Sequence, residues 1–281
     1  MSVLIDTAGL RARDRPVVLL DVRWALGDDR GRERYLAGHL PGAVFVDLET
    51  ELADPPSAGR GRHPLPSLQR LQASARRWGI RQNDAVVVYD ASGGLAAARA
   101  WWLLRWGGLS DVRLLDGGLD AWVRAGGPVE AGDVVPEPGD VTLTGGGMPV
   151  LTIDEAAALP AAGGILLDAR AGARYRGEVE PVDPRAGHVP GAVSAPTAKN
   201  LAEDGTFRPA GDLGRRFADL GVEPGSTVGV YCGSGVTAAH EIAALAVAGI
   251  DAALWPGSWS QWSADPALPV ATGPAPVSAG A

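Results

Sequence analysis

The strongest constraint on the fold is an internal repeat, because both halves of the chain carry the same short motifs in the same order. The matching pairs are residues 17–23 (VVLLDVR) with 165–170 (ILLDAR), 38–44 (GHLPGAV) with 187–193 (GHVPGAV), 85–90 (AVVVYD) with 227–232 (TVGVYC), and 117–122 (GGLDAW) with 257–262 (GSWSQW). Each copy spans about 130 residues, far more than the 20–50 residues of a solenoid repeat. The sequence therefore predicts two homologous domains in tandem.

The repeats and the composition between them also predict the domain boundaries. We expect a first domain over residues 1–130, a linker over 131–149, a second domain over 150–270 and a tail over 271–281. Two prolines and the glycines at 145–147 indicate the linker, and a composition rich in Ala, Pro and Gly indicates a loosely held tail.

Within each copy, short β-branched runs alternate with longer helix-prone segments. Residues 86–89 and 228–231 are continuous apolar runs, as expected for strands buried on both faces of a parallel sheet. Residues 96–106 and 238–248 are long and rich in alanine, which favours helix. We therefore predict an α/β fold in which each domain has a small, mostly parallel sheet flanked by helices.

Composition excludes several classes of protein. With 25 basic and 33 acidic side chains the net charge is −8, and no basic stripe is present, so nucleic acid is not the expected partner. A single cysteine excludes an intramolecular disulfide and any site that needs two thiolates. No segment reaches the ~20 apolar residues of a membrane helix, and the first residues do not resemble a signal peptide. We expect a cytoplasmic protein that does not contact a membrane.

The single cysteine, Cys232, lies where a buried strand is predicted to meet a helix, which is where parallel sheets bind ligands. A helix N-terminus stabilises a thiolate, and the glycines at 233 and 235 allow backbone N–H groups to turn inward around an anion. A buried structural cysteine is the plain alternative. Its presence in only one copy, opposite Asp90 in the other, favours a nucleophile.

Three other interpretations of this loop fail on position or residue type. Residues 233–238 fit the dinucleotide pattern G-x-G-x-x-A, but the pattern comes near the end of its copy and lacks the acidic residue that should follow. A cysteine phosphatase would have arginine six residues after the nucleophile, where this chain has Ala238. A dithiol redox enzyme needs a second cysteine.

Together these landmarks resemble the two-domain rhodanese superfamily of sulfurtransferases over nearly the whole chain. The resemblance rests on the Asp-x-Arg strand ends, the Gly-His-x-Pro-Gly-Ala turns and the loop from Cys232 to Thr237. It implies an inactive first domain, with Asp90 in place of cysteine, and a second domain whose Cys232 becomes a persulfide. The neutral loop Cys-Gly-Ser-Gly-Val-Thr is similar to the 3-mercaptopyruvate branch, whereas the thiosulfate branch usually has cationic residues after the cysteine.

The resemblance also implies the other site residues. Arg174 matches an arginine that binds the negative end of the donor, and Arg185 matches a second one less closely in spacing; Arg170 is expected to be structural. A Ser-His-Asp relay would be formed by Ser234, His63 and Asp47. The backbone of Gly233, Gly235, Val236 and Thr237 would complete the substrate site. An exposed loop position for His63 and a surface position for Arg174 are the plain alternatives.

We therefore expect a sulfurtransferase that moves sulfur from 3-mercaptopyruvate, through a Cys232 persulfide, to an external thiol or cyanide acceptor, with a thioredoxin-like protein as one candidate acceptor. No metal or organic cofactor is implied. Two alternatives stay open at this point: a thiosulfate:cyanide sulfurtransferase, and a persulfide carrier with little small-molecule turnover.

Overall fold

The computed structural model describes residues 2–57 and 59–276, so residues 277–281 of the predicted tail lie outside the described residues. The chain divides into two compact units. Unit 1 comprises the residues up to Asp54, Leu65–Met148 and Leu201–Phe207; unit 2 comprises Pro55–Pro64, Pro149–Asn200 and the residues from Arg208 onward. The segment 55–64, which its position in the sequence assigns to the first domain, packs with unit 2 in the structure.

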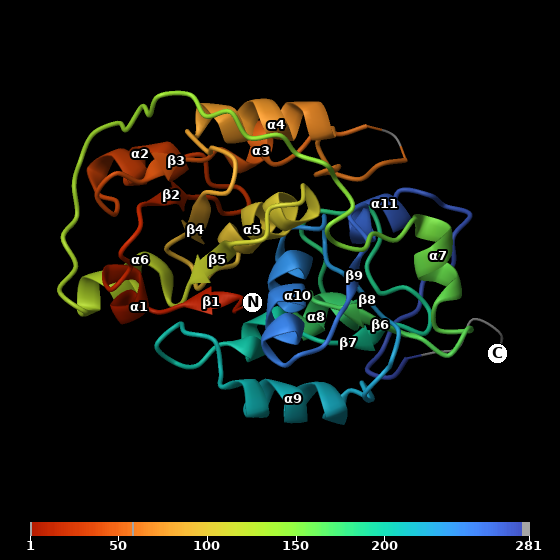
Figure 1. Ribbon diagram of the computed structural model, residues 1–281. Coiled ribbons are helices and arrows are strands. Elements are labelled where there is room, and N and C mark those ends of the chain that lie inside the picture. Colours follow the sequence, from red (N-terminus) through yellow and green to blue (C-terminus); the bar gives the residue numbers. More distant parts are fainter. Residues whose placement is uncertain (1, 58, 277–281) are drawn as a thin grey trace. The chain divides into compact units, whose positions relative to one another are not determined.

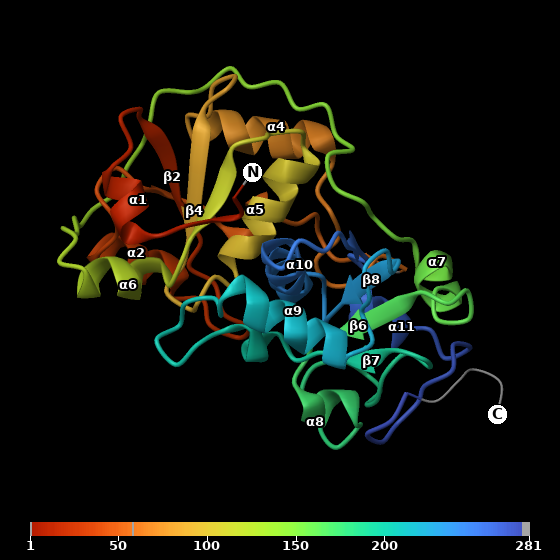
Figure 2. The same cartoon turned by 60° about the horizontal axis from the view of Figure 1, so that its bottom comes forward.

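Unit 1 is built on a five-stranded parallel sheet with the order β1-β5-β4-β2-β3. Its strands are β1 (Leu4–Ile5), β2 (Val17–Asp21), β3 (Val44–Phe45), β4 (Ala85–Tyr89) and β5 (Val112–Leu115). Its helices are α1 (Thr7–Arg11), α2 (Gly31–Ala37), α3 (Leu48–Glu51), α4 (Leu68–Arg77), α5 (Ala97–Trp106) and α6 (Gly118–Arg124). Helices cover both faces of the sheet, with α4 and α5 on one side and α1 and α6 on the other (Figure 2).

Unit 2 repeats this plan with four parallel strands in the order β7-β6-β8-β9. Its strands are β6 (Ile165–Asp168), β7 (Val193–Ser194), β8 (Val228–Tyr231) and β9 (Ala253–Leu254). Its helices are α7 (Ile153–Ala158), α8 (Gly172–Tyr175), the 3-10 helix η1 (Thr197–Asn200), α9 (Ala210–Asp219), α10 (Thr237–Val247) and α11 (Ser258–Trp262). Figure 1 labels these elements apart from η1, and Figure 2 shows α9 and α10 on one side of β6 and β8, with α7 and α11 on the other. The predicted α/β fold is confirmed.

The apolar runs of the sequence form the two cores. The strand β4 is fully apolar, and its residues 86–89 are all buried because helices cover both faces. In unit 2, one face of the sheet packs against a cluster that includes one tryptophan directly after β9 and two from α11: Ala156, Leu159, Leu166, Val189, Ala192, Tyr231, Trp255, Trp259 and Trp262. This burial holds α11 against the carboxyl end of β8, where the cysteine loop begins.

Both units contain the same buried ion pair, at the carboxyl end of β2 in unit 1 and of β6 in unit 2. In unit 2, Arg170 donates to both carboxylate oxygens of Asp168 and to the carbonyl of Gly187 at 2.6 Å. In unit 1, Arg23 makes the equivalent bonds to Asp21 and to the carbonyl of the glycine that precedes His39. Because the pattern recurs in the copy without a cysteine, it stabilises the loops of the fold, as expected for Arg170.

The Gly-His-x-Pro-Gly-Ala turn that occurs in both halves of the repeat is also structural. His39 stacks on Tyr35 with ring centroids 4.2 Å apart, and His188 stacks on Tyr175 at 3.7 Å. Both histidine rings are fully buried, and burial lowers the pKa of His188, which keeps that ring neutral. In the part of the chain that the structure describes, no helix is both long and apolar enough to cross a membrane.

Candidate active site

Cys232 follows β8 directly and is followed within five residues by the first turn of α10. The side chain is buried, and Sγ accepts a hydrogen bond from the backbone N–H of Gly235 at 3.1 Å. Ser258 holds the backbone of the cysteine, because its Oγ accepts from the Cys232 N–H at 3.1 Å and donates to the carbonyl of Trp255. The sulfur therefore has a polar contact from its own loop, at the N-terminal end of an eleven-residue helix.

The glycine at 235 is required by this geometry. Gly235 has a φ of +77°, and a Cβ atom built on it would lie 2.7 Å from the carbonyl oxygen of Pro256. Any other residue would be strained there and would push the loop away from the segment that leads into α11. Of the other predicted loop residues, Val236 is the buried N-cap residue of α10 and Thr237 is its first residue.

Ser234 and His63 form a buried hydrogen-bonded pair, although they are 171 positions apart in the sequence. The distance between Ser234 Oγ and His63 Nδ1 is 2.7 Å, and the two residues are 5% and 2% exposed. The alternative of an exposed loop position for His63 is therefore wrong. Since imidazole changes its charge near neutral pH, this pair is suited to proton transfer beside the cysteine loop.

The segment 55–64 places His63 beside Ser234, because hydrogen bonds hold this segment against α11 within unit 2. The N–H of Arg62 donates to Ser260 Oγ at 3.0 Å, and Gln261 Nε2 donates to the carbonyl of Gly59 at 2.5 Å. Gly61, with a φ of +82°, makes this approach possible, since a Cβ atom there would lie 2.6 Å from the carbonyl oxygen of Gly257.

Arg174, on α8, extends toward the cysteine loop but is already bound to carboxylates. Its Nε and Nη2 atoms donate to the two oxygens of Glu180, at 3.1 and 2.6 Å, and Nη2 also reaches Asp183 at 3.1 Å. Burial alone raises the pKa of Glu180, but the hydrogen bonds from Arg174 and from backbone N–H groups lower it overall. The fork of Arg174 thus holds Glu180, and its Nη1 faces Gly233.

Arg62 reaches the same place from the opposite side. Its Nη1 donates to Asp183 at 2.7 Å, so Asp183 bridges Arg62 and Arg174. A Cβ atom built on Gly233 would lie 3.3 Å from Arg62 Nη2 and 3.5 Å from Arg174 Nη1. Two guanidinium groups therefore lie close to the residue that follows the cysteine, and the absent side chain at 233 leaves them room.

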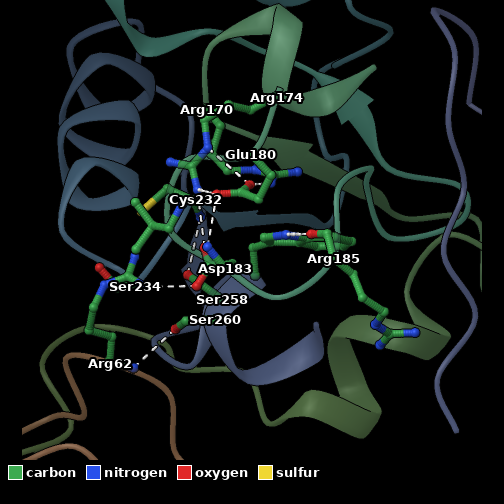
Figure 3. Close-up of polar contacts among 12 residues, drawn as sticks. Arg62, Arg170, Arg174, Glu180, Asp183, Arg185, Cys232, Ser234, Ser258 and Ser260 are labelled. Carbon is green, nitrogen blue, oxygen red and sulfur yellow. Dashed lines mark hydrogen bonds and ion pairs between the residues drawn. The ribbon is translucent and has the colours of Figure 1, made fainter. Parts of the chain in front are cut away.

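Arg185 is placed differently from the expected donor-binding position. Its guanidinium donates to the backbone carbonyls of Trp262, Ser263 and Leu268 at 2.8–2.9 Å, and also to that of Asp265. These carbonyls lie at and after the C-terminus of α11, where a helix leaves acceptors unpaired. Figure 3 shows the Arg185 guanidinium directed away from the group around Cys232. Its contacts indicate that it stabilises the end of α11.

Asp47 lies in unit 1, where it is the N-cap residue of α3 and accepts from the N–H groups of Glu49 and Thr50. Its part in a relay stays a prediction. Among residues 2–57 and 59–276, no group of three or more His, Cys, Asp and Glu side chains is arranged to hold a metal ion.

The equivalent loop of unit 1 explains why Asp90 replaces the cysteine there. The Asp90 carboxylate accepts four backbone hydrogen bonds from its own loop, from Ser92 and Gly94 on one oxygen and from Ala96 and Ala97 on the other, at 2.7–3.0 Å. The copy without a cysteine therefore fills its own backbone anion nest with a fixed carboxylate.

Sequence reasoning did not assign Arg62, Glu180, Asp183 and Ser258 to the site. Two signals pointed toward three of them: Arg62 directly precedes His63, and Glu180 and Asp183 follow Arg174 by six and nine residues, in the segment after α8. Neither signal specifies that the three charged side chains meet beside Cys232, because that meeting depends on the packing of residues 55–64 against α11.

Comparison with known proteins agrees with this geometry. The Rhodanese-like domain matches residues 6–125 and 152–265. The chain belongs to the rhodanese family. It is 54% identical, over 96% of both chains, to SseB of Mycobacterium tuberculosis, which is provisionally named a thiosulfate sulfurtransferase. It is 48% identical to a Pseudomonas aeruginosa protein provisionally named a 3-mercaptopyruvate sulfurtransferase, over 94% of this chain and 95% of that one.

A solved rhodanese-family structure has the same fold. The crystal structure of the 3-mercaptopyruvate sulfurtransferase SseA from Escherichia coli has a TM-score of 0.82, with 32% identity over 92% of this chain and all of that one. The prediction of a rhodanese with two homologous domains and sulfurtransferase activity is thereby confirmed.

Proposed function

We propose that this rhodanese-family sulfurtransferase takes sulfur from 3-mercaptopyruvate, holds it as a persulfide on Cys232 and passes it to an external thiol or cyanide. The single observation that carries the choice of donor is the 2.7 Å hydrogen bond between Ser234 and His63. It matters because the two candidate donors release different leaving groups.

In the first half-reaction the Cys232 thiolate attacks the thiol sulfur of the donor. The new S–S bond forms as the C–S bond breaks, and the bonding electron pair leaves on carbon as the enolate of pyruvate. The enolate must then take up a proton, which a hydroxyl backed by a histidine supplies well. Thiosulfate instead releases sulfite, a stable anion that needs no proton. A buried Ser–His pair beside the nucleophile therefore favours the carboxylated donor.

The remaining groups bind the donor's negative end and the new persulfide. Arg174 presents Nη1 toward the cysteine loop, and the Gly235 N–H contacts Sγ at 3.1 Å. In the second half-reaction the acceptor attacks the outer sulfur and Cys232 leaves as the thiolate, which gives ping-pong kinetics. Because the sequence holds one cysteine, the acceptor thiol comes from another molecule. We propose a thioredoxin-like protein as that acceptor, and the cytoplasm as the location.

The test compares two donors across two variants. Cys232→Ser is expected to abolish transfer from either donor, and activity at the parent rate would refute the proposal. His63→Gln is expected to lower kcat with 3-mercaptopyruvate by roughly 100-fold or more, the usual worth of a general acid, with a much smaller effect on thiosulfate. Equal losses with both donors would contradict the proton-transfer role.

Thiosulfate is the second candidate donor, because SseB, which is 54% identical to this chain, carries that name. Values of kcat/KM for the two donors, measured side by side with dithiothreitol as acceptor, decide between them. We expect the larger value for 3-mercaptopyruvate. Negligible turnover of both free donors, together with efficient discharge to a partner protein, would instead indicate a persulfide carrier.

A further inference from the structure

We propose that unit 1 carries a binding site for a small amphipathic carboxylate, a molecule with an apolar body and one negatively charged head group. The site is a cavity of about 510 Å³ on the face of the sheet that α1 and α6 cover (Figure 2). All the residues that line it belong to unit 1, and none of them is part of the cysteine site. Cavities of this size hold ligands up to the size of a drug molecule.

Part of the lining is the apolar surface of the unit 1 core. Val17 and Leu19 are two residues apart on β2, so their side chains point to the same face of the sheet. Both pack against the core cluster that contains Leu40 and Trp122, and all four of these residues line the cavity. An apolar ligand body is therefore favoured here, because it removes this surface from water.

The rest of the lining is positively charged, because it includes Arg11, Arg13 and Arg15. Arg11 is held in place: its guanidinium carbon lies 4.7 Å from the centroid of the Trp122 ring, and its Nη2 donates to the carbonyl of Ala125 at 3.0 Å. The described residues that line the cavity include no aspartate or glutamate. This charge favours a carboxylate head group over a neutral or cationic one.

Arg13 is the arginine best placed to bind that head group. Its Nη2 donates to Asp111 at 2.8 Å, which fixes the guanidinium, and Asp111 also accepts from Arg113 at 2.9 Å. The Nη1 of Arg13 is buried and has no hydrogen-bond partner among the described residues. A buried N–H without an acceptor costs stability, and a ligand carboxylate would supply the acceptor.

The other copy of the repeat closes the matching position with apolar residues. Leu159 and Pro160 directly follow α7, and Leu159 packs in the core cluster of unit 2. A Cβ atom built on Gly191 would lie 2.8 Å from Pro160, whereas one built on Gly42, the matching glycine of unit 1, would meet no described atom within 4 Å. Unit 1 thus has a cavity with three arginines where unit 2 has packed apolar side chains.

The test compares octanoate with octan-1-ol, which have the same chain and differ in the charge of the head group. Calorimetry on the whole protein should show one site for octanoate and at least about 10-fold weaker binding of octan-1-ol, since a hydrogen bond to a charged group is lost. 8-Bromooctanoate gives a local readout, because bromine quenches indole fluorescence at contact. Its quenching should saturate, and the saturable part should disappear in Trp122→Phe.

Two variants separate the head group from the apolar body. Arg13→Met should weaken octanoate about 10- to 100-fold and change octan-1-ol by less than about twofold. Val17→Phe should weaken both ligands, because the larger side chain fills the apolar part of the cavity and leaves the arginines in place. Arg30→Met is the matched control: Arg30 is an exposed arginine of unit 1, paired with Asp28 at 3.6 Å, that does not line the cavity. Both affinities should stay at the parent value in Arg30→Met.

Three outcomes would overturn the proposed site. The first is octanoate binding that does not saturate, and the second is equal affinity for octanoate and octan-1-ol. The third is an Arg13→Met protein that binds octanoate as tightly as Arg30→Met does. None of these outcomes affects the proposal for sulfur transfer through Cys232, because that chemistry uses other residues.

Discussion

The Asp90 carboxylate, which accepts the inward-facing backbone N–H groups of its own loop in unit 1, leads to the sharpest prediction about stability. Asp90 is 1% exposed, and its two oxygens accept hydrogen bonds from four backbone N–H groups, three in the loop after β4 and one on the first residue of α5. Asp90→Ala removes all four acceptors at once. Each unsatisfied buried donor costs roughly 1–3 kcal/mol, and such costs are not additive within one network. We expect unit 1 to lose about 3–5 kcal/mol.

Asp90→Asn separates shape from charge. The amide has nearly the same size, but it offers one oxygen, so one pair of N–H groups would face an N–H₂ group instead of an acceptor. We therefore expect this variant to lose at least about 2 kcal/mol despite its shape. Formate should restore part of the stability of Asp90→Ala, because it replaces the deleted carboxylate, and the gain should rise with its concentration by mass action.

Hydrogen exchange is the suitable assay, because a chain of two domains need not unfold in one transition. Amides of β4 and α5 report on unit 1, and amides of β8 and α10 serve as an internal reference. Asp29→Ala is the matched control, since Asp29 is an exposed aspartate of the same unit. A loss below about 1 kcal/mol for Asp90→Ala, or an Asp90→Asn protein as stable as the parent, would refute the reasoning.

Three further predictions follow from single contacts. Arg185→Met should lower the stability of unit 2 by about 2–4 kcal/mol in the same exchange assay, because the end of α11 loses its donors, while donor saturation of the folded fraction stays unchanged; a raised half-saturation would return Arg185 to the donor site. Gly61→Ala should reduce persulfide formation without affecting unit 1, because its Cβ would meet the carbonyl of Gly257; parent-like rates would contradict the required close approach. Burial raises the pKa of Asp21 to about 6, against the opposing effect of Arg23, so this group binds its proton more tightly in the folded state. Its contribution to the stability of unit 1 should be fully present below about pH 4 and lost as pH rises through 6, and Asp21→Asn should remove that slope in denaturant titrations.

Much of the architecture follows from local pattern. Apolar runs with strand spacing and alanine-rich helical segments specify which residues form β4, β8, α5 and α10, because burial on both faces of a sheet requires continuous apolar strands. Because the same motifs recur in both halves of the chain, the same fold is expected twice. The same pattern places Cys232 at the carboxyl end of a parallel strand, so the position of this cysteine in the fold is evident before any coordinates.

What the sequence by itself determined is therefore the two α/β domains and the position of the single cysteine at the end of a parallel strand, with Asp90 at the matching position of the other copy. Only the tertiary structure decided which arginines lie beside the cysteine loop: Arg62 and Arg174 lie close to Gly233, whereas Arg185 is bound to carbonyls at the end of α11. The physical reason is that loop side chains have no periodic pattern. Their partners depend on packing between distant segments, here residues 55–64 against α11, and on which backbone groups that packing leaves without a hydrogen bond.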